Sequence, residues 1–242
     1  MKHFLKENDF SDDEILEVFD RASHLKQNRK QRLGLANDLA GQTWGLLFYK
    51  NSTRTRVSFE VGINELGGNA LVLDQQSTQI GRGESIHDTA KVLSRYLDGL
   101  VIRTFGHEII EEFAANANIP VVNALTDLLH PCQIYADCFS IAEKLGESRD
   151  PFASLTGRKL AFLGDTSCNM ANSWIMAGKL FGLKVSLAGP QGFAPKPDLL
   201  DLLNKEGMGY DFQFTSDPKE AVTDADIVYT DVWVSMGAEE EE

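Results

Sequence analysis

The sequence predicts an α/β fold built from two domains, each with a parallel β-sheet. Short apolar runs alternate with amphipathic stretches along the whole chain, and this alternation is typical of parallel α/β layers. A chain of 242 residues is also long enough to form two hydrophobic cores. We expect strands near the following residues: Leu46, Leu71, Leu100, Val121, Leu160, Val185, Phe212 and Val228.

The boundary between the domains is predicted from a polar segment, residues 145–151, which is soon followed by a new apolar run, Lys159–Leu163. Before it, a helical pattern extends from Pro131 to Leu145, and proline is well tolerated in the first turn of a helix. We therefore expect a first domain over residues 1–145 and a second over residues 146–242. The last expected strand is followed by no helix that covers it, so this second domain is predicted to be incomplete at its C-terminus.

Composition excludes several classes of protein. Lys and Arg total 23 against 36 Asp and Glu, and a net charge of −13 argues against a nucleic-acid or membrane-surface partner. The cysteines, Cys132, Cys138 and Cys168, form no CxxC pair, which argues against a disulfide framework or a zinc ribbon and favours a reducing cytoplasm. The N-terminus does not resemble an export signal, and no apolar run is long enough to span a membrane.

The most informative motif is Ser52–Arg56, with the sequence STRTR. An apolar run of strand type, Trp44–Phe48, precedes it, and Phe59, Ile63 and Leu66 follow at helical spacing. The motif is thus expected at a strand-to-helix turn, where unpaired N–H groups, hydroxyls and guanidinium groups together favour an anion such as phosphate. A simple helix cap with two solvated arginines is the alternative.

Arg103 is the second candidate for an anion site. It ends a strand-like segment, Asp98–Thr104, and ligands of open α/β sheets bind outside the carboxyl ends of the strands. We therefore expect Arg103 to point toward the Ser52–Arg56 turn. A surface arginine without such a role is the alternative.

His130 and Gln133 lie at the predicted start of a helix, in the motif HPCQ. An imidazole and an arginine suit the oxygen of a carbonyl substrate, and the side-chain oxygen of a glutamine accepts a hydrogen bond from an NH2 group. We expect no metal site, because His130 and Cys132 flank a proline and no second pair of ligands lies at a suitable spacing.

Three further segments are polar. Gln79–Ser85 is rich in glycine and precedes an expected helix over Ile86–Tyr96. It is predicted either to bring Gln79 to a site formed elsewhere or to be an ordinary solvated connection. Residues 164–169 and 231–237 follow strands and contain no Lys or His, which favours a ligand bearing an ammonium group; Asn169 and Asp231 as simple caps are the alternative. The glycine spacing of nucleotide-binding loops is missing, so no nucleotide cofactor is expected.

Together these segments resemble the aspartate/ornithine carbamoyltransferase family, through STRTR at Ser52–Arg56, HPCQ at His130–Gln133 and SMG at Ser235–Gly237. The resemblance covers nearly the whole chain. It implies transfer of the carbamoyl group of carbamoyl phosphate to the side-chain amine of L-ornithine, without cofactor or metal, in a homotrimer or a multiple of trimers. Another amine acceptor, or a non-catalytic anion-binding or assembly protein, is the alternative.

The resemblance also implies a role for individual residues. The phosphate is expected at Ser52, Thr53, Arg54 and Thr55, with Arg103 and with Gln79 of a neighbouring subunit. Thr55, Arg103 and His130 are expected at the carbonyl oxygen, Gln133 at the carbamoyl nitrogen, and Asn169, Asp231, Ser235 and Met236 at ornithine.

Two features of the chain depart from the family pattern. The family usually has Asn at the position of Cys168. Its members also continue past residue 242 with a His-Cys-Leu-Pro segment and a last helix. Because that segment contacts ornithine, we expect the 242-residue chain itself to be weakly active or inactive.

Overall fold

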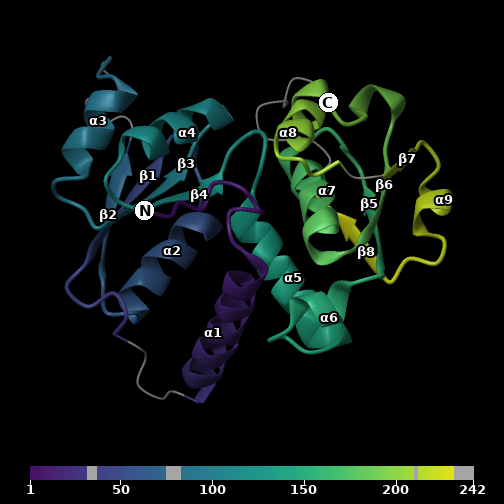
Figure 1. Ribbon diagram of the computed structural model, residues 1–242, viewed down its shortest axis with the longest axis horizontal. Helices are drawn as coiled ribbons and strands as arrows, with labels where there is room; N and C mark the ends of the chain where they lie inside the picture. The colour runs from purple at the N-terminus through teal and green to yellow at the C-terminus, as the bar shows by residue number, and fades with distance from the viewer. Residues whose placement is uncertain (32–36, 75–82, 210–211, 232–242) are drawn as a thin grey trace. The chain divides into compact units, whose positions relative to one another are not determined.

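The computed structural model describes residues 1–31, 37–74, 83–209 and 212–231 (Figure 1). Its contacts divide the chain into two compact units, Met1–Asp127 and Leu128–Glu242. Helix α5 (Pro131–Leu145) packs on helices of the second unit, whereas the domain limits predicted from sequence, 1–145 and 146–242, assign it to the first domain. The bounds of α5 are those predicted from sequence.

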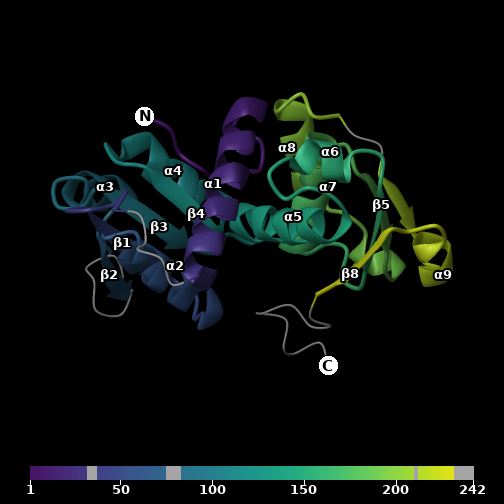
Figure 2. The same ribbon diagram turned by 90° about the horizontal axis from the view of Figure 1, so that it is seen from below.

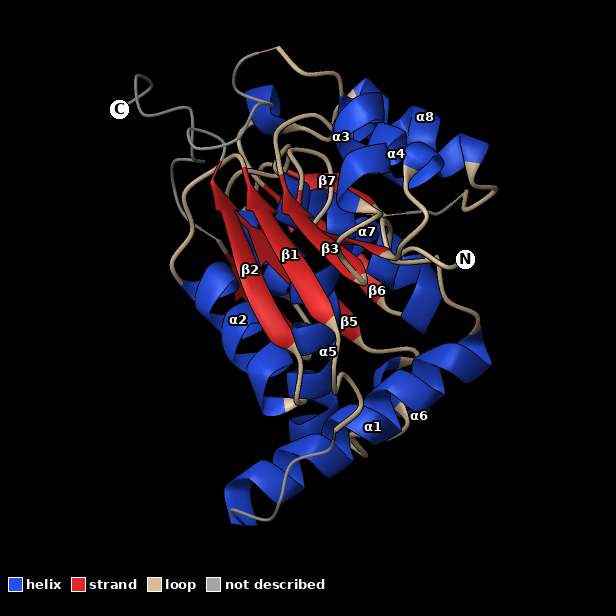
Figure 3. Ribbon diagram, turned by 90° about the vertical axis from the view of Figure 1, so that its left-hand side faces the viewer, coloured by secondary structure: helices blue, strands red, loops and turns tan. Residues whose placement is uncertain are grey.

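The first unit contains a parallel sheet with the strand order β2-β1-β3-β4. Figure 3 shows β2, β1 and β3 running in the same direction. The elements of this unit are α1 (Asp12–Gln31), β1 (Thr43–Phe48), α2 (Arg54–Glu65), β2 (Asn69–Asp74), α3 (Ile86–Leu93), β3 (Gly99–Arg103), α4 (His107–Asn116) and β4 (Val121–Leu125).

Each face of this sheet has its own core. Leu46 and Val101 pack with Ile63 of α2 on one face, whereas their neighbours Leu47 and Ile102 pack on the other face with the helices α3 and α4 (Figure 1). Successive side chains of a strand point to opposite faces, so continuous apolar runs such as those of β1 and β3 fit strands that are covered on both sides.

One helix is shorter than its sequence pattern predicts. The pattern extends from Ile86 to Tyr96, but α3 ends at Leu93. The Ser94 hydroxyl donates to the Ala90 carbonyl oxygen (2.7 Å), and the Tyr96 N–H donates to the Leu93 carbonyl oxygen, which closes a turn in place of another helical turn.

The second unit contains a parallel sheet with the strand order β7-β6-β5-β8. Helices α7 and α8 lie on one side of it and α9 on the other (Figures 1 and 2). Besides α5, the elements are α6 (Pro151–Leu155), β5 (Lys159–Leu163), α7 (Asn169–Phe181), β6 (Lys184–Ala188), a 3-10 helix (Gln191–Phe193), α8 (Pro197–Lys205), β7 (Gln213–Thr215), α9 (Pro218–Val222) and β8 (Ile227–Thr230).

The strand orders place a switch point in each sheet. In the first unit, β1 leads through α2 to β2 on one side, whereas β3 lies on its other side; in the second, β5 leads through α7 to β6, whereas β8 lies on its other side. Open α/β sheets bind ligands outside the carboxyl ends of the strands at such points. None of the helices in the described ranges is long and apolar enough to cross a bilayer.

Candidate functional site

The Ser52–Arg56 motif lies at the switch point of the first sheet, where the connection after β1 enters the first turn of α2; it thus occupies the strand-to-helix turn that was predicted. Ser52 and Thr55 are half-buried, and Thr53 and Arg54 are exposed. Thr53 is the capping residue of α2, but its side chain makes no capping hydrogen bond within the described chain. The alternative of a Thr53 side-chain cap is therefore not supported, and the N–H groups at the start of α2 remain available to a ligand.

Arg103 ends β3 in register with Phe48 at the end of β1, and only 4% of its surface is exposed. Its Nη1 donates a hydrogen bond to Thr55 Oγ1 (3.4 Å), which confirms the predicted proximity of Arg103 to the motif. Its Nε is buried and has no hydrogen-bond partner among the described residues. Burial, followed by the charge of Arg54, lowers the pKa of Arg103. A buried guanidinium beside a second cation favours an anionic ligand.

Lys50 adds a third cation at this edge, and the sequence analysis missed it. Lys50 pairs with Asp127 and lies over the ring of Phe105, with its Nζ 4.6 Å from the ring centre. Lys50 could have been identified from the sequence by its position two residues after the end of β1, since ligands bind at that edge of the sheet.

His130 and Gln133 lie at the start of α5 in the second unit. His130 is buried, and its backbone N–H donates to the hydroxyl of Ser173 on α7 (2.8 Å). Gln133 is exposed in the first turn, and its Nε2 donates to the Asp137 carboxylate (2.9 Å) one turn later. The backbone of His130 is thus held by Ser173, and the side chain of Gln133 is held by Asp137.

Asn169 and Asp231 lie at the switch point of the second sheet, after β5 and β8 respectively. Asn169 is the first residue of α7 and is half-buried, while Cys168 occupies the capping position; the alternative of Asn169 as the helix cap is wrong. Asp231 is exposed. The remaining candidates, Gln79, Ser235 and Met236, lie outside the described residues.

Carboxylates gather around this second switch point. Burial is the largest cause that raises the pKa of Asp137, and the charge of Asp231 raises it further. Burial also raises the pKa of the Cys168 thiol to about 11, with smaller contributions from the charges of Asp165 and Asp231. The charge of Asp231 acts on both Asp137 and Cys168. Together, Asp137, Asp165 and Asp231 produce a negative potential that suits an ammonium group.

Asp137 and Tyr229 also lie at this site and were not among the residues expected from the sequence. The Tyr229 hydroxyl donates to Asp137 (2.9 Å), whose other oxygen accepts from Gln133. The spacing of four residues between Gln133 and Asp137 on one helix was a usable signal. No local pattern pointed to Tyr229, because its contact with Asp137 spans 92 residues.

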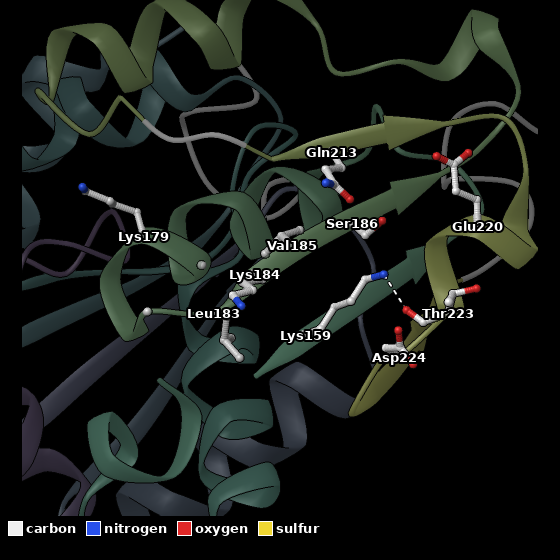
Figure 4. A pocket seen from close by; sticks show the side chains of 12 residues that line it. Lys159, Lys179, Leu183, Lys184, Val185, Ser186, Gln213, Glu220, Thr223 and Asp224 are labelled. Atoms are coloured by element: carbon white, nitrogen blue, oxygen red, sulfur yellow. Dashed lines mark hydrogen bonds between the residues drawn. The ribbon is translucent and has the colours of Figure 1, made fainter. Parts of the chain in front are cut away.

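A hollow of about 770 Å³ opens at the amino ends of the strands of the second sheet, opposite the carboxyl ends that carry Asn169 and Asp231 (Figure 4). Lys159, Lys184 and Gln213, which line it, are the first residues of their strands. Lys159 already donates from Nζ to the Thr223 carbonyl oxygen (2.7 Å). The hollow therefore lies away from the carboxyl ends where the candidates gather. The described residues also include no group of three or more His, Cys, Asp or Glu arranged to hold a metal ion.

Comparison with known families gives two matches. Residues 2–143 match "Aspartate/ornithine carbamoyltransferase, carbamoyl-P binding domain", and residues 156–242 match "Aspartate/ornithine carbamoyltransferase, Asp/Orn binding domain". Both switch points described above fall within these ranges.

Among individual proteins, the chain is 46% identical over 241 residues to an ornithine carbamoyltransferase of Pelobacter propionicus, covering 100% of this chain and 76% of that protein. It is 49% identical over 225 residues to one of Syntrophus aciditrophicus, covering 93% and 71%. A solved ornithine carbamoyltransferase from Pyrococcus furiosus is 40% identical with a TM-score of 0.86, covering 99% of this chain and 74% of that one. One from Burkholderia thailandensis is 39% identical with a TM-score of 0.85, covering 96% and 76%.

Proposed function

Because this chain belongs to the aspartate/ornithine carbamoyltransferase family, we propose that it transfers the carbamoyl group of carbamoyl phosphate to the side-chain amine of L-ornithine, giving L-citrulline and phosphate. The observation that supports this most directly is Arg103, a buried guanidinium whose Nε has no partner among the described residues and whose Nη1 contacts the STRTR turn. A buried donor of this kind needs an acceptor, and a phosphate or carbonyl oxygen supplies one.

The phosphate is proposed to bind at the start of α2. The backbone N–H groups and hydroxyls of Ser52, Thr53 and Thr55 surround an anion there, and Arg54 and Arg103 neutralise its charge. A charge-assisted hydrogen bond contributes about 1.5–3 kcal/mol, so several of them hold a phosphate firmly. The same cations stabilise the phosphate as it leaves.

The carbamoyl group is proposed to be recognised through donors for its oxygen and an acceptor for its nitrogen. Thr55, Arg103 and His130 donate to the oxygen, which becomes negative when the neutral amine attacks the carbon, and Gln133 accepts from the NH2 group. The new C–N bond forms, the bond between the carbamoyl carbon and the phosphate oxygen breaks, and the proton that the amine loses leaves with the phosphate. Each donor to such an oxygen typically contributes about 10²–10³ in rate.

Ornithine is proposed to bind at the switch point of the second sheet, through Asn169, Asp231, Ser235 and Met236. The carboxylates of Asp137, Asp165 and Asp231 support this assignment, because the potential that they produce attracts an ammonium group.

We further propose that the protein is a homotrimer or a multiple of trimers, with Gln79 reaching the phosphate of a neighbouring subunit. Apolar side chains exposed on the first unit support association: Val57 on α2 (51% exposed), Leu71 on the edge strand β2 (46%) and Tyr96 after α3 (78%). A cytoplasmic location is supported by the three cysteines, all within the described residues, which form no disulfide.

A panel of amine acceptors tests the proposed reaction. Radiolabelled carbamoyl phosphate is offered with ornithine, putrescine or aspartate, and the carbamoylated product is separated and counted. We expect ornithine to be the preferred acceptor. A preference for putrescine or aspartate would overturn the assignment of ornithine but keep the chain in its family.

A further inference from the structure

We propose that Asp137 and Tyr229 are positioning residues that fix the direction of the Gln133 amide, so that its oxygen faces the NH2 group of the carbamoyl substrate. They would thereby select a carbamoyl phosphate over an acyl phosphate that has a methyl group in place of NH2. This inference rests on the proposed function, which places Gln133 at the carbamoyl nitrogen.

The first step is the hydrogen bond between Gln133 and Asp137. A glutamine amide is nearly symmetrical in shape and can turn over, so that nitrogen and oxygen exchange places. An ionised carboxylate only accepts hydrogen bonds, so the atom of Gln133 that lies 2.9 Å from Asp137 must be Nε2. The oxygen of Gln133 then points away from Asp137, and the side chain that carries it is exposed, so a ligand can reach this oxygen.

The second step is the support that Tyr229 gives to Asp137. The Tyr229 hydroxyl donates to the other carboxylate oxygen of Asp137 (2.9 Å). The ring of Tyr229 is stacked on Phe162 of β5, with 5.7 Å between ring centres, and packs edge-on against Trp174 of α7 at 5.2 Å. The tyrosine is thus held by two buried rings, and both oxygens of Asp137 have a donor, so the carboxylate has a single preferred orientation.

The chemical consequence is selectivity for nitrogen. With the amide oxygen toward the ligand, Gln133 accepts a hydrogen bond from the carbamoyl NH2, which a methyl group cannot donate. With the amide turned over, two NH2 groups would face each other and neither would have an acceptor. A site built to bond a polar group discriminates against an analogue that lacks it more strongly than an apolar site does.

The test uses two stable probes that differ only in this group. Phosphonoacetamide carries NH2 on its carbonyl carbon, and acetonylphosphonate carries CH3 in its place. Binding of each is measured by calorimetry for the parent protein, Asp137→Asn, Tyr229→Phe and Gln133→Ala. Ser140→Ala is the matched control, because Ser140 is exposed on the same helix and its hydroxyl, among the described residues, bonds the Ala136 carbonyl oxygen alone.

We expect Asp137→Asn to weaken phosphonoacetamide binding by about 3- to 10-fold, the range of one net hydrogen bond, and acetonylphosphonate binding by less than about twofold. An asparagine presents either a donor or an acceptor and so permits both directions of Gln133. Tyr229→Phe should give a smaller loss of the same selectivity. In the Gln133→Ala background, Asp137→Asn should have no further effect on either probe.

The outcomes separate this inference from the proposed function. Equal weakening of both probes, or an unchanged affinity for phosphonoacetamide, would mean that Asp137 does not orient Gln133. If Asp137→Asn fails to fold, Tyr229→Phe, which keeps the buried ring, provides the same comparison. A parent protein that binds neither probe would overturn the proposed function itself, and this inference with it.

Discussion

Arg103 offers the sharpest test of the anion site, because the structure predicts opposite effects of its removal on stability and on binding. Arg103 is 4% exposed and, within the described residues, forms no ion pair; its guanidinium group donates one long hydrogen bond there, to Thr55 at 3.4 Å. A buried cation in this setting is costly to the ligand-free protein. The substitution Arg103→Met keeps a long, unbranched and flexible side chain at this position but removes the positive charge.

The expected magnitude follows from two opposing contributions. Replacing a buried ion with an apolar side chain is neutral or stabilising by about 1–4 kcal/mol, and losing a hydrogen bond costs about 0.5–1.5 kcal/mol. Because the bond from Arg103 to Thr55 is long (3.4 Å), its loss should cost only about 0.5 kcal/mol, so the free energy of unfolding of ligand-free Arg103→Met should lie between about 0.5 kcal/mol below that of the parent and about 3.5 kcal/mol above it. For a protein of this size each kcal/mol corresponds to about 2–4 °C in Tm, so a nearly equal or higher Tm is expected.

The effect on binding has the opposite sign. Inorganic phosphate at a hundred times its Kd stabilises the parent by about 2.7 kcal/mol, or roughly 5–10 °C in Tm. We expect Arg103→Met to lose this shift. Arg56→Met is the control: Arg56 lies in the same motif but is exposed and paired with Glu60 at 3.8 Å, so its removal should leave both Tm and the shift nearly unchanged.

Thermal unfolding with and without phosphate measures both effects. A Tm for ligand-free Arg103→Met that is several degrees below the parent would show that Arg103 stabilises the fold, contrary to this reasoning. A full phosphate shift in Arg103→Met would show that the anion binds elsewhere.

Three further predictions concern other parts of the molecule. Ser173→Ala removes the acceptor of the buried His130 N–H and should lower the free energy of unfolding in urea by about 1–3 kcal/mol, whereas exposed Ser140→Ala should change it by less than about 0.5; equal effects would contradict the role of Ser173. Since burial raises the pKa of Cys168 to about 11, this thiol keeps its proton to higher pH, and its alkylation by iodoacetamide at pH 8 should be about a hundredfold slower in folded than in urea-unfolded protein, rising between pH 9 and 11; similar rates would refute the shift. Tyr96→Glu, which puts a charge on an exposed apolar surface, should lower the mass found by light scattering, and an unchanged assembly would exclude this surface as an interface.

The fold was largely predictable because parallel strands that are buried on both faces appear as continuous apolar runs. The strand Lys159–Leu163 has the predicted bounds for this reason. The helix Pro131–Leu145 has the predicted bounds because a proline starts it. The end of α3 was not predictable from periodicity, because the apolar pattern continues to Tyr96 while the Ser94 hydroxyl bonds the helix backbone. Local hydrogen bonds decide where a helix stops, and a hydrophobic pattern does not report them.

The candidate site likewise contains contacts that the sequence could predict and contacts that it could not. The contact between Arg103 and Thr55 was predictable, since Arg103 ends β3 and Thr55 follows the neighbouring strand β1 at the same edge of the sheet. The contact between Asp137 and Tyr229 was not, because it depends on β8 pairing with β5 rather than on any spacing along the chain. The capping position of α7 at Cys168, one residue before the Asn169 of the alternative interpretation, was not predictable either, because local hydrogen bonds rather than the hydrophobic pattern decide where a helix begins.

The most direct test of the central claim is the formation of citrulline from carbamoyl phosphate and ornithine, measured at high protein concentration for the parent and for Arg103→Met. The proposed function predicts a rate for the parent that depends on ornithine and falls at least about a hundredfold in Arg103→Met, since the substitution removes both a phosphate ligand and a donor to the carbonyl oxygen. Citrulline formation at equal rates in the two proteins, both above the rate without protein, would contradict it.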